Sequence, residues 1–238
     1  YAGRFRRTAL GSIAMTPQDL NKPIHVLKFG GTSVATPELI RNAAQRIARR
    51  RDSGVHVVCV VSAMGDTTDR LLSLAREIST RPPSRELDVL LSAGEVQSMA
   101  LLSMALNELG IAARSYTGQQ GGIRTDAQHS EAKILSIDPD RVLEALNRDE
   151  VVVLAGFQGH DDRDEITTLG RGGSDTSAVA MAAALEAERC EILTDVSGVF
   201  TADPRIVEGA RQISALGYDE MLEMANLGAR VLHGRSVE

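Results

Sequence analysis

The feature that most constrains the fold is a nearly continuous apolar segment at residues 55–61, Val-His-Val-Val-Cys-Val-Val. A strand of this composition is typical of a parallel sheet that helices cover on both faces. Further strands are predicted at residues 24–28, 112–116, 151–155 and 190–193, and they alternate with helical patterns. The sequence therefore predicts an α/β protein, a three-layer αβα sandwich with a mostly parallel central sheet.

The helices are expected between these strands. Thr36 followed by Pro37 is typical of a helix start, because threonine caps the first turn and proline suits its first position. Pro82 and Pro83 interrupt the chain before a long helical pattern at residues 85–109. The remaining predicted helices are residues 68–79, 139–147, 175–187 and 218–226.

The first predicted strand carries Lys28 directly into the glycine pair Gly30 and Gly31. Glycines let a backbone approach an anion with its N–H groups, and the lysine adds a point charge beside it. The arrangement suggests a phosphate-binding turn, although the usual P-loop pattern is not found in the sequence. Taken alone, the segment is equally typical of an ordinary strand-to-helix turn.

A second glycine-rich segment, residues 168–177, reads Thr-Leu-Gly-Arg-Gly-Gly-Ser-Asp-Thr-Ser. It leads into a predicted helix that begins at Ser174 or Asp175, so it forms a second anion-binding helix N-terminus. The planar guanidinium of Arg171 suits a carboxylate better than a pyrophosphate. A third polar segment, residues 194–205, follows the strand at 190–193.

These segments share one position in the predicted sheet. Each follows a strand: residues 28–31, 62–66 and 194–195, together with Gly156. Ligands of open α/β sheets bind at the carboxyl ends of the strands. The sequence therefore predicts one composite site there.

Five motifs in order resemble the amino-acid-kinase family, and within it the aspartate kinases. They are K-F-G-G-T-S at 28–33, S-A-M-G-D-T-T-D at 62–69, G-E at 94–95, G-R-G-G-S-D at 170–175, and T-D-V-S-G-V-F-T-A-D-P-R at 194–205. The resemblance covers residues 24–238. It implies ATP-dependent phosphorylation of the β-carboxylate of L-aspartate to 4-phospho-L-aspartate, the first step toward lysine, threonine and methionine. It also implies a smaller hairpin region within residues 121–129 and 156–167.

The resemblance assigns roles to residues at these motifs. Lys28 and Asp175 are the expected catalytic residues: Lys28 sits against the transferring phosphate, and Asp175 orients Lys28 or joins the magnesium shell through water. The Mg²⁺ itself is expected to be held mainly by the ATP phosphates rather than by protein ligands. The expected ATP-binding residues are Lys28, Phe29, Gly30, Gly31, Ser62, Ser174, Thr194, Asp195, Phe200, Thr201, Ala202, Asp203, Pro204, Arg205 and Arg230.

The aspartate acceptor needs different partners. Arg171 suits the α-carboxylate, and Glu95 could hold the ammonium. The expected substrate-binding residues are Asp66, Thr67, Thr68, Asp69, Glu95, Arg171, Gly172, Gly173 and Ser174. Plainer interpretations stay open: helix capping for residues 66–69 and for Asp175, a solvated helix face for Glu95, and a surface loop for residues 194–205.

The composition argues against partners that carry strong negative charge. The net charge of −6 argues against nucleic-acid or acidic-membrane partners. No apolar run reaches the ~18 residues that span a bilayer. Cys59 and Cys190 are predicted to be buried free thiols, and the five histidines show no metal-ligand spacing. We expect a cytoplasmic homodimer.

The two ends of the sequence differ from the rest. Residues 1–23 are basic near their start and are expected to be an extension left from cloning or a leader, ahead of a catalytic domain at residues 24–238. Relatives continue beyond residue 238 into two regulatory domains, so we expect a truncated catalytic domain. Arg230 stands where relatives carry lysine. A non-catalytic fragment that binds nucleotide or amino acid, or a sibling kinase with another acceptor, stays an alternative.

Overall fold

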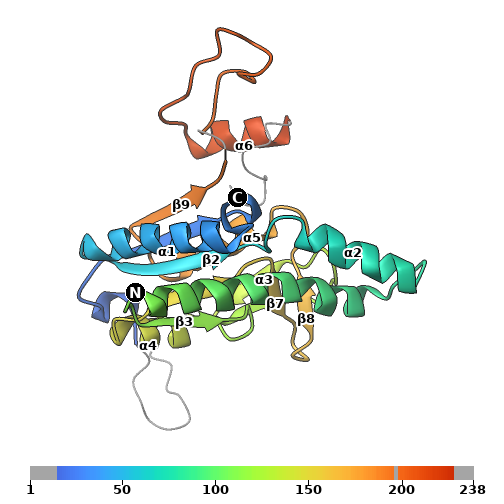
Figure 1. Ribbon diagram of the computed structural model, residues 1–238, viewed down its shortest axis with the longest axis horizontal. Helices are drawn as coiled ribbons and strands as arrows, with labels where there is room; N and C mark the ends of the chain where they lie inside the picture. The colour runs from blue at the N-terminus through green and yellow to red at the C-terminus, as the bar shows by residue number, and fades with distance from the viewer. Residues whose placement is uncertain (1–14, 196–197, 228–238) are drawn as a thin grey trace, which may run out of the picture.

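The computed structural model describes residues 15–195 and 198–227. Its centre is a sheet of five parallel strands in the order β3-β6-β2-β1-β9 (Figure 1). These strands are β1 (Ile24–Phe29), β2 (His56–Val61), β3 (Ala113–Tyr116), β6 (Val151–Ala155) and β9 (Arg189–Leu193). The predicted parallel sheet is confirmed.

Helices cover both faces of this sheet. On one face, α1 (Pro37–Asp52) and α3 (Ser84–Glu108) pack on alternate strand residues such as Val57, Cys59 and Val61. On the other face, α4 (Asp140–Asn147) and α5 (Gly173–Ala184) pack on residues between them, such as Val58 and Val60. The middle strand β2 is therefore buried throughout, which explains its apolar sequence.

The strand register brings the predicted site segments together. Phe29 pairs with Val61 and with Leu193, and Val61 also pairs with Ala155. Four strands thus end in one row, and the segments that follow them start at one edge of the sheet. The predicted clustering at the carboxyl ends is confirmed.

A second sheet of four short strands has the order β5-β4-β7-β8. Its strands are β4 (Ile123–Thr125), β5 (Ile134–Ile137), β7 (Gln158–His160) and β8 (Ile166–Thr168). It includes the expected hairpin region but extends beyond it, because β5 lies outside the predicted ranges. Strand β5, Ile-Leu-Ser-Ile, is apolar but only four residues long, and its Leu135 is largely exposed.

Among the described residues, only α3 has the length and apolar composition of a membrane-crossing helix. Half of its most apolar stretch is buried, and it contacts β2, β3, β6 and β8 as well as α1. It also buries the side chains of Asp88 and Glu95. These contacts identify α3 as the core helix of the fold. Helix α2 (Thr67–Ile78) packs against it.

The N-terminal segment and helix α5 differ from the predicted boundaries, whereas α6 (Tyr218–Asn226) matches its predicted range. Met15 and Leu20, from the expected extension, pack against the α4–α5 side of the core. Helix α5 ends at Ala184, earlier than predicted, because Glu186 takes a left-handed conformation with φ +47°. After β9, a long loop and α6 project away from the body at the top of Figure 1.

Candidate active site

Lys28 and Asp175 form the centre of the site. Lys28 is the penultimate residue of β1, is only 8% exposed, and faces the side of the sheet on which α5 packs. Its Nζ lies 2.6 Å from Oδ1 of Asp175, an ion-pair distance without the angles of a hydrogen bond. Asp175 occupies the first turn of α5, where the helix dipole stabilises a negative charge. The pair joins a strand end to a helix N-terminus.

The turn after Lys28 is pressed against the turn after β2. A β-carbon added to Gly31 would lie 2.8 Å from the carbonyl oxygen of Ala63. The Gly65 N–H donates a hydrogen bond of 3.1 Å to the Gly31 carbonyl. Only glycine allows this approach of two backbones. The turn is thereby fixed beside Lys28.

Glu95 is the second charged group of the site. Its side chain is buried, and its Oε1 accepts a 3.1 Å hydrogen bond from the Ala63 N–H. Its Oε2 has no hydrogen-bond partner among the residues that the structure describes. Burial raises the pKa of Glu95 from 4.5 to about 7, and the Ala63 hydrogen bond offsets only part of this effect. A buried acceptor of this kind is suited to a positively charged ligand group.

These groups line a cavity of about 350 Å³ at the carboxyl edge of the sheet. The lining residues are Lys28, Gly31, Ser62, Ala63, Gly65, Thr68, Glu95, Phe157, Gly170, Gly172, Gly173, Ser174 and Asp175. Sequence reasoning missed Ala63, Gly65, Phe157 and Gly170 as site residues. Ala63, Gly65 and Gly170 lie within the motifs at residues 62–69 and 170–175, which was the available signal, whereas Phe157 lies outside every motif.

Several predicted residues do not line this cavity with their side chains. Phe29 is buried in the core against α1 and α3. Asp66 is the N-cap residue of α2 and is exposed, and its side chain makes no capping hydrogen bond. Asp69 and Arg171 are also exposed. Arg171 stands between two lining glycines, and the left-handed Gly172 (φ 71°) turns the chain into α5.

The nucleotide segment begins beside the glycine pair. The Gly30 N–H donates a 3.2 Å hydrogen bond to the carbonyl oxygen of Leu193, which places Thr194 next to that turn. The Gly30 N–H was expected to donate to a phosphate oxygen. In this structure it donates to the Leu193 carbonyl instead. Thr194 and Asp195 are exposed at the end of β9.

The rest of this segment lies in the projecting loop. The Thr201 N–H donates to the Arg211 carbonyl, and Phe200 forms a β-bridge with Gln212. Arg205 pairs with Asp203 at 2.8 Å, and its hydrogen bonds lower the pKa of Asp203 to about 2. The structure does not bring residues 200–205 to the cavity lining. Arg230 and the motif around it lie outside the described residues.

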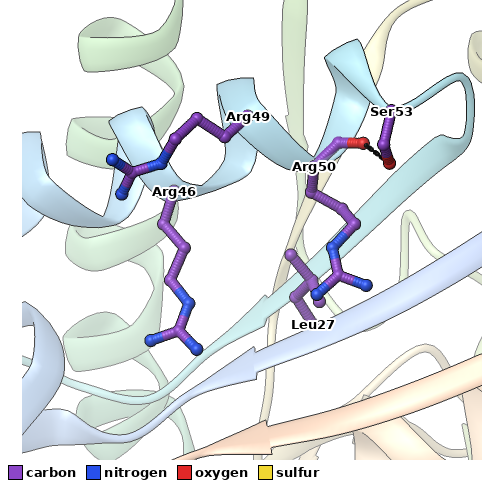
Figure 2. A pocket seen from close by; sticks show the side chains of 5 residues that line it. All are labelled: Leu27, Arg46, Arg49, Arg50 and Ser53. Atoms are coloured by element: carbon purple, nitrogen blue, oxygen red, sulfur yellow. Dashed lines mark hydrogen bonds between the residues drawn. The ribbon is translucent and has the colours of Figure 1, made fainter.

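A second cavity, of about 410 Å³, lies under α1. Figure 2 shows that Arg46, Arg49 and Arg50 extend from α1 around it, with Leu27 of β1 at its floor. Arg50 is already paired with Glu191 at 2.8 Å. No glycine-rich segment reaches this cavity, so the cavity that contains Lys28 is the stronger candidate.

Within the residues that the structure describes, no three His, Cys, Asp or Glu side chains form a metal-binding cluster. A metal ion at this site would take most of its ligands from elsewhere. Phosphate oxygens and water are the usual source for Mg²⁺, which sheds its water reluctantly.

A model of the amino acid kinase family matches residues 23–238. The aspartokinase of Bacillus sp. (strain MGA3) is 58% identical over 213 residues, which are 90% of this chain and 52% of that protein. Aspartokinase 2 of Bacillus subtilis (strain 168) is 57% identical over the same shares of the two chains. The chain thus spans about half the length of these relatives.

Solved structures of aspartate kinases are also similar to this chain. Aspartate kinase from Synechocystis has a TM-score of 0.79 and 51% identity, covering 90% of this chain and 35% of that one. E. coli aspartokinase III in complex with aspartate and ADP has a TM-score of 0.78 and 30% identity, covering 90% of this chain and 58% of that one.

Proposed function

Because this chain belongs to the amino acid kinase family, we propose that it transfers the γ-phosphoryl group of ATP to the β-carboxylate of L-aspartate. The observation that carries the proposal is one cavity that holds both the Lys28–Asp175 pair and the unpartnered Oε2 of Glu95. A phosphate and an amino-acid ammonium each find an oppositely charged group there. The identity with aspartokinases supports aspartate as the acceptor.

Lys28 and the α5 N-terminus form the phosphate half of the site. In the transfer, an oxygen of the aspartate β-carboxylate forms a bond to the γ-phosphorus. The bond from that phosphorus to the β–γ bridging oxygen breaks, and ADP leaves with the electron pair. No proton needs to move, so the protein mainly positions the groups and neutralises charge. Lys28 does this at the transferring group, and Asp175 holds the lysine in place.

Glu95 and Arg171 form the acceptor half. The ionised Glu95 would pair with the ammonium of aspartate, which satisfies the Oε2 that lacks a partner among the described residues. Arg171 would turn from solvent to grip the α-carboxylate with two parallel hydrogen bonds. Thr68 and Ser174, at the cavity wall, offer hydroxyl groups to the same ligand.

Magnesium fits this arrangement as a partner of the nucleotide. It would supply positive charge to the phosphate groups, and Asp175, which lines the cavity, would hold it through water. Residues 194–205 and Arg230 stay predicted contacts of the adenosine end. A cytoplasmic location and a homodimer also stay predictions from the sequence.

The test is an acceptor panel on this chain. Coupled ADP release is measured with aspartate, glutamate and carbamate, and hydroxylamine traps any acyl phosphate as its hydroxamate. We expect aspartyl hydroxamate that depends on ATP. Activity with glutamate or carbamate but none with aspartate would show that aspartate is not the acceptor. Binding of ATP and aspartate by calorimetry without any turnover would favour a non-catalytic binding fragment.

A further inference from the structure

We propose that Asp88 is a positioning residue for the acceptor half: its buried carboxylate holds the loop at residues 169–173, which carries Arg171, against helix α3, which carries Glu95. The inference rests on the proposed function, since it explains how that acceptor site is kept in shape. Asp88 itself does not line the cavity. It acts through the backbone that does.

Asp88 is fully buried and is contacted by donors from two segments that are distant in the sequence: Thr168, and the adjacent residues His129 and Ser130. The Thr168 hydroxyl donates to its Oδ1 at 2.6 Å, and the Thr168 N–H donates to its Oδ2 at 3.1 Å. The Ser130 N–H lies 3.0 Å from both carboxylate oxygens. His129 Nδ1 lies 2.9 Å from Oδ2.

No lysine or arginine in the described part of the chain pairs with this carboxylate. Its charge is balanced by N–H and O–H donors, which are costly to leave unpaired in a buried place. Asp88 therefore fixes the positions of those donors.

The held donors belong to the segments that shape the glycine-rich loop. Thr168 is the last residue of β8, so the loop starts at the next residue. The Ala132 N–H donates a 2.9 Å hydrogen bond to the Thr168 carbonyl. A β-carbon on Gly170 would lie 3.0 Å from the Ser130 carbonyl oxygen, so the segment around Ser130 packs directly on the loop. By holding both segments, Asp88 fixes the start of the loop from two sides.

Asp88 and Glu95 lie on one face of α3, since seven residues make about two helical turns. Ser92 lies between them on that face, and its carbonyl accepts a 3.0 Å hydrogen bond from the Gln158 side chain. A buried polar stripe of Asp88, Ser92 and Glu95 therefore runs along this part of α3. One end of the stripe holds the Arg171 loop, and the other end presents a carboxylate to the cavity.

The test compares Asp88→Asn with Asp161→Asn. Asparagine keeps the volume of Asp88 but turns one acceptor into an NH₂ group that faces N–H donors. Asp161 is a matched control: it is also buried, and it accepts hydrogen bonds from the Arg163 and Glu165 N–H groups in the β7–β8 turn. This turn contains no predicted site residue.

We expect Asp88→Asn to raise the aspartate KM at least tenfold, with the ATP Kd within twofold of the parent. Amide hydrogen exchange at residues 168–173 should accelerate at least tenfold. Asp161→Asn should change neither quantity. If Asp88→Asn does not fold, Thr168→Val removes only the 2.6 Å hydroxyl bond and should produce a smaller change in the same two quantities.

The two readouts separate failure of this inference from failure of the proposed function. If the parent turns over aspartate, and Asp88→Asn or Thr168→Val matches Asp161→Asn in both aspartate KM and exchange, Asp88 has no positioning role. If the parent prefers another acceptor, the proposed function is wrong, while the exchange of residues 168–173 still decides whether Asp88 holds the loop.

Discussion

The Lys28 ammonium at the end of β1 lies 2.6 Å from the Asp175 carboxylate in the first turn of α5. Both side chains are largely buried, so each charge depends on the other for compensation. The lysine is therefore fixed in place before any phosphate arrives. A preorganised charge of this kind stabilises a transition state without reorganising during the reaction.

Replacing Lys28 by Met should lower kcat at least tenfold, a loss of about 1.4 kcal/mol in transition-state stabilisation. The charge matters most while the phosphoryl group is in transfer, so ATP binding by calorimetry should change much less. Lys22→Met is the control, because Lys22 also forms an ion pair, with Asp149 at 2.7 Å, away from the cavity. A Lys28→Met protein that keeps its kcat within about threefold of the parent would refute the role.

The free energy of unfolding should fall as pH rises from about 4.5 to about 7, because burial raises the pKa of Glu95 to about 7. Folded Glu95 keeps its proton in that window while the unfolded chain loses it, so the stabilisation is complete below the window and lost above it. The Glu95 contribution is about 3 kcal/mol across the window.

Urea denaturation of Glu95→Gln at several pH values measures this contribution. In Glu95→Gln, the free energy of unfolding should lose the decrease with rising pH that Glu95 causes. In Glu108→Gln, at an exposed position on the same helix, that decrease should remain. Identical pH dependence in the parent and Glu95→Gln would show that Glu95 titrates normally.

Arg171→Ala should raise the aspartate KM at least tenfold and leave the ATP Kd nearly unchanged. Arg171→Lys should be almost as harmful, because a single ammonium cannot reproduce two parallel hydrogen bonds to one carboxylate. Arg163→Ala removes another exposed arginine, in the β7–β8 turn, and should have no effect. Weaker ATP binding with unchanged aspartate saturation would move Arg171 to the phosphate half of the site.

Gly31→Ala should destabilise the protein by about 1–3 kcal/mol and lower kcat, because the added β-carbon would lie 2.8 Å from the Ala63 carbonyl oxygen. Backbone must move to relieve that contact, and the moved backbone is beside Lys28. Gly209→Ala adds a methyl group where nothing lies within 4 Å, so it serves as the control. Equal chemical denaturation midpoints for the two variants would contradict the close packing of the turn.

The sequence predicted those parts of the fold that depend on local pattern. The apolar segments located all five strands of the central sheet, and the position of each motif after a strand located the composite site. The resemblance located Glu95, whose burial no periodicity revealed. The short strand β5 was missed because an apolar run of four residues does not by itself distinguish a strand, and only its pairing with β4 identifies it as one.

Other features depend on contacts between distant segments. The buried acceptor role of Asp88 arises only when Ser130 and Thr168 are folded around it. Arg171 is exposed, and residues 200–205 project away from the cavity. A sequence motif indicates which residues contact a ligand, but it does not predict where their side chains lie when no ligand is bound. Their predicted contacts stay predictions.

The packing of helices on both faces of the sheet fixes the relative positions of two charged groups in the site. Lys28 faces the α5 side of the sheet, while Glu95 projects from α3, which packs on the opposite face, and both groups line the cavity at the carboxyl edge of the sheet. In the proposed function, an acceptor bound in that cavity reaches from Glu95 to the phosphoryl group beside Lys28 with its own carbon chain. Glutamate is longer than aspartate by one methylene, which displaces its terminal carboxylate by roughly 1 Å, and a displacement of that size can cost about 100-fold in rate. Under the proposed function, the sheet therefore holds these two groups at a spacing that selects the length of the amino acid.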